Sequence, residues 1–199
     1  VPGSPLESQV IFIGGYDSVI TNSTYGNPAG AYPAKQWHDF IGFTPDETNS
    51  GDLGWLSINH EMISNDPNLG DGGGMTTFKI KRDPDTDSII VVEQTLSDGR
   101  NGYFFNVDFA NTVGETGMNC GGITSDADGR IWTAEEWFRT SNPSIHYDWY
   151  GGPAVSDTSD FTISNSGIPM ADGQTVKKFE NFNYMVEIDP REAVAIRKQ

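Results

Sequence analysis

The stretch 54-GWLSINHE-61 recurs later in the chain as 129-GRIWTAEE-136, and this repeat decides the fold that we expect. Both stretches run from a glycine through aromatic and β-branched residues to a glutamate. Each is followed by a second such run and an Asp-Pro pair, in 78-FKIKRDP-84 and 184-YMVEIDP-190. Aromatic and β-branched residues favour strands, and Asp-Pro favours a turn. The sequence therefore predicts a repeating unit made of a strand that ends in glutamate, followed by a hairpin.

The rest of the chain supports an all-β fold. The 23 glycines and 11 prolines indicate many turns, and no helical period is sustained. The runs 75-MTTFKIKR-82 and 88-SIIVVEQT-95 flank an Asp-Pro turn, and 10-VIFIGG-15 is a further expected strand. Repeated small antiparallel sheets are typical of β-propeller blades. We expect residues 1–199 to form one domain that contains the first blades of a larger propeller, with a long loop at about 140–174.

Charge and hydropathy narrow the classes of partner. The chain of 199 residues carries a formal net charge of −16, which repels nucleic acid and anionic membranes and suits the binding of cations. No apolar run approaches the roughly 18 residues of a membrane span. We therefore expect neither a nucleic-acid ligand nor a membrane span.

Strand alternation selects candidate ligands. Asn59 and Glu61 share one face of the first repeat strand, and His60 points to the other. If both repeat strands are the innermost strands of their blades, Glu61 and Glu136 converge on the central channel, whereas Glu135 faces away. Converging carboxylates repel each other unless a cation lies between them. The chain's single cysteine, Cys120, lies in a glycine-rich stretch and cannot form a disulfide within the chain.

Several short motifs occur in one order and together resemble the PhoX-type alkaline phosphatases. These motifs are 38-HDFIGF-43, 59-NHE-61, 119-NCGG-122, 135-EE-136 and 184-YMVEIDP-190. The resemblance covers most of the chain, from about Trp37 to Pro190. It departs from the family at 125-SDADG-129, where members usually have a Pro-Trp-Gly turn, and at Ala134, where they often have a cysteine.

The resemblance implies a secreted or periplasmic β-propeller enzyme that hydrolyses phosphate monoesters with ferric iron and calcium. It implies that Cys120 is an iron ligand and that Glu61 and Glu136, or Glu135, are carboxylate ligands. Asn59 is expected near the metals or the phosphate, as part of the catalytic group. Family members are longer and supply further ligands and a phosphate-binding arginine. We therefore expect the remaining blades in a C-terminal part or a second chain, and little activity from residues 1–199 alone.

Two alternatives remain open from the sequence. One is a calcium-binding β-propeller without catalysis, and the other is a lactonase-like propeller hydrolase with a calcium held by glutamate and asparagine. Cys120 distinguishes them from the phosphatase, because calcium prefers oxygen ligands and iron accepts a thiolate. His38, Asp39 and His146 are minor candidates, and His60 is expected to pack or to orient a neighbour.

Overall fold

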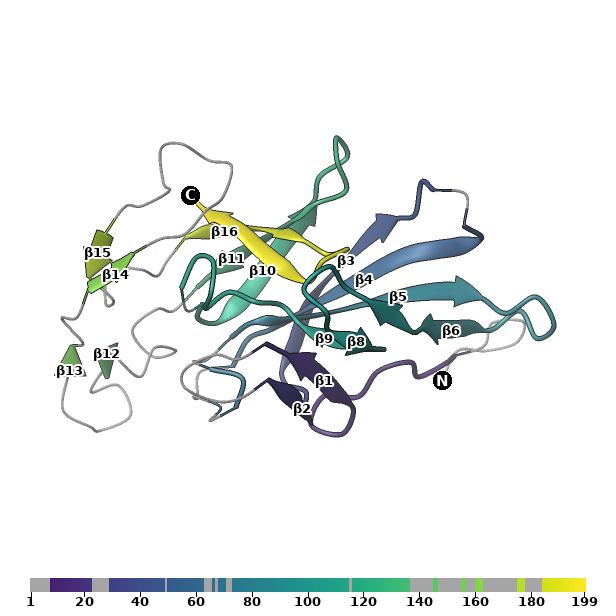
Figure 1. Ribbon diagram of the computed structural model, residues 1–199, viewed down its shortest axis with the longest axis horizontal. Coiled ribbons are helices and arrows are strands. Elements are labelled where there is room, and N and C mark those ends of the chain that lie inside the picture. The colour runs from purple at the N-terminus through teal and green to yellow at the C-terminus, as the bar shows by residue number, and fades with distance from the viewer. Residues whose placement is uncertain are drawn as a thin grey trace.

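The structure is a computed structural model built from strands, in agreement with the predicted all-β class (Figure 1). It describes residues 8–22, 29–48, 50–62, 66, 68–70, 73–114, 116–136 and 184–199, and the backbone of four short strands between 145 and 177. Within these residues there is no helix, and hence none long and apolar enough to cross a membrane.

The larger of the two main sheets has seven strands in the order β2-β1-β9-β5-β4-β3, with β6 also paired to β5. All of its pairs are antiparallel except β1 with β9. Its strands are β1 (Ser18–Thr21), β2 (Gly30–Pro33), β3 (His38–Pro45), β4 (Asp52–His60), β5 (Met75–Arg82), β6 (Ile89–Val92) and β9 (Phe105–Asn106).

The second main sheet has four antiparallel strands in the order β10-β11-β16-β17. They are β10 (Asn119–Thr124), β11 (Ile131–Glu135), β16 (Met185–Asp189) and β17 (Val194–Lys198). Three isolated hairpin pairs complete the strands, namely β7 (Gln94–Thr95) with β8 (Asn101–Gly102), β12 (Ile145–His146) with β13 (Val155–Ser156), and β14 (Asp160–Thr162) with β15 (Thr175–Lys177). The loop predicted at about 140–174 thus contains short strand pairs, and its remaining residues lie outside the described part of the chain.

The repeat predicted from the sequence is present as two four-stranded antiparallel meanders. The first meander is β3–β4–β5–β6 and the second is β10–β11–β16–β17. Both close their last hairpin with the same turn, in which the Asp83 and Asp189 side chains accept hydrogen bonds from the amides of Asp85 and Arg191. Local residue patterns were sufficient to predict these turns.

Two sequence-based expectations need correction. The repeat strands β4 and β11 are the second strands of their meanders, with β3 and β10 outside them as edge strands, so the glutamates do not follow innermost strands. The run 10-VIFIGG-15 forms no strand; its Ile11 and Phe12 instead pack on the large sheet beside Ile58, Phe78 and Ile80. Apolar, β-branched runs fit such packing as well as they fit a strand. No closed barrel or propeller is formed by the described strands.

The two sheets pack face to face through one hydrophobic core. Met75 from β5 meets Ile131, Val186 and Ile188 from the second sheet in this core, and all four side chains are buried. The close approach of the two sheets depends on Gly122. An added Cβ atom there would lie 2.6 Å from the ring of Phe40 and 2.7 Å from the backbone oxygen of Trp132. The β3 and β10 edges therefore meet, and the candidate site lies where they do.

Candidate functional site

Each meander carries a β-bulge in its first strand, opposite the end of its second strand and close to the glutamate, Glu61 or Glu136, that follows that strand. In the first meander, Asp39 and Phe40 of β3 lie opposite the single residue Asn59 of β4. In the second, Cys120 and Gly121 of β10 lie opposite Ala134 of β11. A bulge places two residues against one and redirects their side chains.

The bulges make Asp39 the structural equivalent of Cys120, and Glu61 the equivalent of Glu136. The pairs His38↔His60 and Asn119↔Glu135 fix this correspondence, because each immediately precedes both residues in question. Sequence comparison of the repeat missed it, since the offset is 75 residues between the glutamates (136−61) but 81 between Asp39 and Cys120 (120−39).

A backbone contact anchors each glutamate in the same way. The amide of Glu61 donates to the carbonyl oxygen of Trp37 at 2.8 Å, and the amide of Glu136 donates to that of Met118 at 3.1 Å. Trp37 and Met118 have φ angles of 57° and 41°, in the left-handed region that bulky residues rarely adopt. The repeat therefore extends to a strained backbone conformation at equivalent positions.

These elements bring Asp39, Glu61, Cys120 and Glu136 together, and we call them the four-residue cluster. The ligand atoms of Asp39, Glu61 and Cys120 lie within 4.8 Å of one another. The carboxyl group of Glu136 is within hydrogen-bonding reach of that of Glu61. Asp39 and Glu136 are exposed, whereas Glu61 and Cys120 are half-buried. The structure thus brings three of the sequence-predicted ligands together and adds Asp39, which the sequence offered only as a minor candidate.

The closeness of the acidic groups raises the pKa values of two members of the cluster, Glu61 and Cys120. Burial raises the pKa of the Glu61 carboxyl group, and the charges of Asp39 and Glu136 raise it further. A hydrogen bond to Asp39, followed by burial and the nearby carboxylates, raises the pKa of the Cys120 thiol to about 12. A cation bound here would reverse both effects, because it favours the charged forms of its ligands.

Asn59 lies beside the cluster, and its buried side-chain oxygen has no hydrogen-bond partner among the described residues. Its side chain is 0% exposed, and its amide nitrogen donates to the carbonyl oxygens of Cys120 at 2.5 Å and of Gly121 at 3.1 Å. Two carbonyl acceptors fix which amide atom is nitrogen, so the other atom, Oδ1, is the one left without a hydrogen bond. A buried polar atom without a partner costs about 1–3 kcal/mol, which a bound cation would offset.

Glu135 is not part of the cluster. Its Oε1 accepts a hydrogen bond from the Lys198 ammonium at 2.8 Å, and its Oε2 accepts one from the amide of Tyr184 at 2.9 Å. Glu135 and Lys198 are both buried. With its charge and both oxygens engaged by β17 and by the residue before β16, Glu135 is a structural residue within the second sheet.

His60 and His38 lie on the other face of the large sheet. Burial, followed by the charges of Lys35 and His38, lowers the pKa of His60 to about 3, so its ring is neutral. Its Nδ1–H donates to the carbonyl oxygen of Gln36, and its Nε2 accepts from the Thr76 hydroxyl at 2.8 Å. These contacts give His60 the packing role that strand alternation indicates. The predicted minor candidate His146 has no described side chain.

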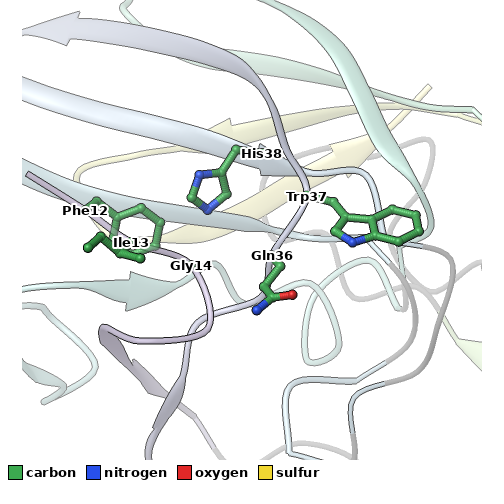
Figure 2. A pocket seen from close by; sticks show the side chains of 6 residues that line it. All are labelled: Phe12, Ile13, Gly14, Gln36, Trp37 and His38. Carbon is green, nitrogen blue, oxygen red and sulfur yellow. The ribbon is translucent and has the colours of Figure 1, made fainter. Parts of the chain in front are cut away.

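An open pocket of about 360 Å³ lies at the start of β3, where His38 stacks on Phe12 with ring centroids 5.1 Å apart (Figure 2). It is lined by Phe12, Ile13, Gly14, Gln36, Trp37 and His38. His38 is the ladder partner of His60, so its ring lies on the face opposite to the four-residue cluster.

The donor set of the cluster fits a metal ion. It offers one thiol sulfur and three carboxyl groups. The neighbouring Asn59, whose amide nitrogen contacts the backbone of Cys120, carries a further unpartnered oxygen. Iron accepts thiolate and carboxylate together, and calcium takes oxygen ligands alone. No family model, curated protein or solved structure matches this chain.

Proposed function

We propose that this chain forms part of a metal-dependent phosphomonoesterase of the PhoX type, secreted or periplasmic, with ferric iron and calcium as cofactors. One observation carries the proposal: two equivalent meanders bring a thiol and three carboxyl groups together beside an unpartnered, fully buried amide oxygen. The order of the sequence motifs supports the phosphatase over other cation-binding functions.

The residues that would hold the metals have different chemistry. Cys120 would provide the iron with a thiolate, and Asp39, Glu61 and Glu136 would provide carboxylates. Asn59 Oδ1 would add a neutral oxygen, of the kind calcium binds. The cations would supply positive charge that neutralises a phosphoryl group, which the bare carboxylates would repel.

The chain's own contribution is to hold these groups in place before any ligand binds. Asn59 ties the Cys120 bulge to the large sheet through two carbonyl groups. The carbonyl groups of Trp37 and Met118 fix the backbone at Glu61 and Glu136. Ligands held by packed strands lose little conformational freedom on binding a metal, which favours a defined geometry.

A propeller built from further sheets is part of the proposal. The face of β4 that carries Asn59 packs on the face of β11 that carries Ile131, although the equivalent of Asn59 in β11 is Ala134, on the opposite face. This head-to-tail contact leaves the Trp132 face of the second meander open to another sheet, together with the part of the Ile58 face of the first meander that Ile11 and Phe12 do not cover. Such contacts form rings when the rotation closes. Ile41, Phe43 and Ile123 are exposed on these two faces.

The test combines metal content with catalysis. Purified protein is loaded with ferric iron and calcium, and its metals are measured by mass spectrometry beside its visible absorbance. We expect bound iron with a thiolate-to-iron absorbance band, and Cys120→Ser should lose the band and most of the iron. The protein isolated whole from its source should hydrolyse 4-nitrophenyl phosphate. Iron content that is unchanged in Cys120→Ser, or no hydrolysis by the metal-loaded whole protein, would contradict the proposal.

A cation-binding protein without catalysis is the second candidate. The arginines favour this second candidate. Each arginine in the described part of the chain pairs with an acidic group outside the cluster, so none of them is placed to bind a phosphate at the cluster. A phosphatase would then need a phosphate-binding cation from another sheet. Tight metal binding by the whole protein, without hydrolysis of any phosphate ester, would support this candidate instead.

A further inference from the structure

The last strands of the two meanders, β6 and β17, have outer edges that are covered in different ways. In the second meander, the amide of Ala195 donates to the carbonyl oxygen of Asp108 at 2.9 Å, and the amide of Asp108 donates to that of Ala193 at 2.9 Å. In the first, the amide of Ile89 donates to the side-chain oxygen of Gln9 at 2.9 Å, and the side-chain nitrogen of Gln9 donates to the carbonyl oxygen of Ile89 at 2.5 Å. A backbone segment thus covers the edge of β17, whereas a single side chain covers that of β6 (Figure 1).

Ile89 and Ala195 are equivalent residues of the two meanders. Each lies six positions after the aspartate of its hairpin turn, Asp83 or Asp189 (89−83 and 195−189). The same outward-facing backbone position therefore has a partner in both meanders, as strand edges require when they are not left to water. In β6 that partner is Gln9, which is exposed, so water competes for both of its hydrogen bonds.

The pattern of hydrogen bonds along β6 places the backbone groups of Val91 on the same edge. In the antiparallel ladder with β5, Val91 lies opposite Ile80, and Ile89 lies opposite Arg82. Because Ile89 bonds to Gln9, its backbone groups point away from β5, and those of Val91, two residues along, point the same way. Among the described residues, no group bonds to the outward N–H and C=O of Val91. The edge therefore has an unpaired residue beside the one that Gln9 covers.

We propose that Gln9 prevents β6 from pairing edge to edge with β6 of a second copy of this chain. The strand reads Ile-Ile-Val-Val, and its four side chains are half-buried and uncharged, so no charge within it repels its own copy. Unpaired, uncharged edges of this kind are ready templates for another strand. This inference does not rest on the proposed phosphatase function.

A two-fold axis at Val91 defines the pairing. Two antiparallel β6 strands would join their Val91 residues by two hydrogen bonds, and each Ile89 would lie opposite Glu93 of the second copy. The next pair of bonds needs the N–H and C=O of Ile89, which Gln9 occupies. Gln9 therefore limits the ladder to its central residue, and a longer ladder forms only when its side chain leaves.

The test compares self-association of the wild-type protein and of Gln9→Ala by sedimentation equilibrium. Pairing in the wild type must break both hydrogen bonds of Gln9 in each copy, which is four bonds in a dimer. At the weak end of the usual range for the net contribution of a hydrogen bond, we expect Gln9→Ala to dimerise about 30-fold more tightly. The matched control is Gln36→Ala, which removes another exposed glutamine, at the pocket beside His38, and should associate as the wild type does.

Two further measurements locate the contact. Val91→Pro removes an N–H that points away from β5, so the strand should tolerate it, and Val91→Pro combined with Gln9→Ala should abolish the dimer. Hydrogen exchange is independent of this second substitution, and the Val91 amide should be protected in the Gln9→Ala dimer but not in the wild-type protein. Association of Gln9→Ala that is no tighter than that of the wild type would overturn the proposal. So would a dimer that persists with Val91→Pro, or one in which the Val91 amide stays unprotected.

Discussion

The two meanders share a backbone plan and differ in the side chains that they bring to the cluster. Both have a bulge in the first strand and a left-handed residue whose carbonyl group anchors a glutamate. The first meander places Asp39 in its bulge, and the second places Cys120 there. The first also adds Asn59, where the second has Ala134. The backbone thus fixes where ligands lie, and individual side chains set whether they are hard oxygen or soft sulfur donors.

Comparing the two meanders also distinguishes residues that stabilise the fold from residues that form the cluster. His60 and Glu135 occupy equivalent positions, both are buried, and each is satisfied by partners within the fold. The residues that follow them, Glu61 and Glu136, face each other, and within the described residues no basic side chain pairs with their carboxyl groups. Glu135 and Glu136 are adjacent in the sequence, but Glu135 stabilises the sheet whereas Glu136 belongs to the cluster.

The largest effect is expected at Glu135. Glu135→Ala leaves the buried Lys198 ammonium without its carboxylate, and breaking a buried ion pair costs about 3–5 kcal/mol in the free energy of unfolding. Glu136→Ala is the matched control, because it removes an exposed carboxylate that faces Glu61 and should leave stability nearly unchanged. Urea unfolding of the metal-free protein measures both. Equal losses in the two variants would contradict the assignment of separate roles.

The reactivity of Cys120 tests its electrostatic coupling to Asp39. With the pKa of Cys120 raised to about 12, very little thiolate is present at pH 8 in the metal-free protein. Allowing for the greater nucleophilicity of a more basic thiolate, alkylation by iodoacetamide should be on the order of 50-fold slower than for an unperturbed cysteine.

Asp39→Asn should accelerate this alkylation, because it removes the first cause of the raised pKa. The control Asp85→Asn changes a carboxylate in the distant β5–β6 turn and should have no effect. Since Cys120 is the only cysteine in the chain, mass spectrometry follows the reaction directly. Alkylation at the ordinary rate in the wild-type protein would refute the coupling.

A substitution at Asn59 tests how much the contact between the two meanders contributes to stability. Asn59→Ala removes both hydrogen bonds to the Cys120 bulge, and we expect a loss of about 1–3 kcal/mol in the free energy of unfolding. The variant should also lose stabilisation by added calcium, since it lacks Oδ1. Asn101→Ala, at an exposed hairpin position, is the control. Calcium stabilisation that survives in Asn59→Ala would exclude Oδ1 as a ligand.

The smallest effect concerns the pH dependence of stability. The pKa of Glu61 is raised in the folded protein, so folding favours its protonated form. Its contribution is therefore fully present below the pKa of the unfolded chain and is lost as the pH rises through the folded value. Glu61→Gln should raise the thermal midpoint of the metal-free protein at pH 7 more than at pH 4. An equal change at both pH values would argue against the crowding of carboxylates.

The sequence alone determined the features that depend on local patterns. Strand alternation, β-branched runs and Asp-Pro turns gave the all-β class and the repeat, and they placed His60 on the face opposite to Glu61. The repeat and the resemblance to the phosphatases also selected Glu61, Cys120 and Glu136 as candidate ligands, and the structure brings these three side chains together.

Only the tertiary structure decided which residues meet. Asp39 joins the cluster because a bulge redirects it, and a bulge changes the register by one residue without a clear sequence signal. Glu135 is excluded because Lys198, 63 residues away, supplies its counter-charge. The run 10–15 packs as an irregular segment, and β4 and β11 lie inside their sheets. These outcomes depend on contacts between residues distant in sequence, whose free energies the local pattern does not contain.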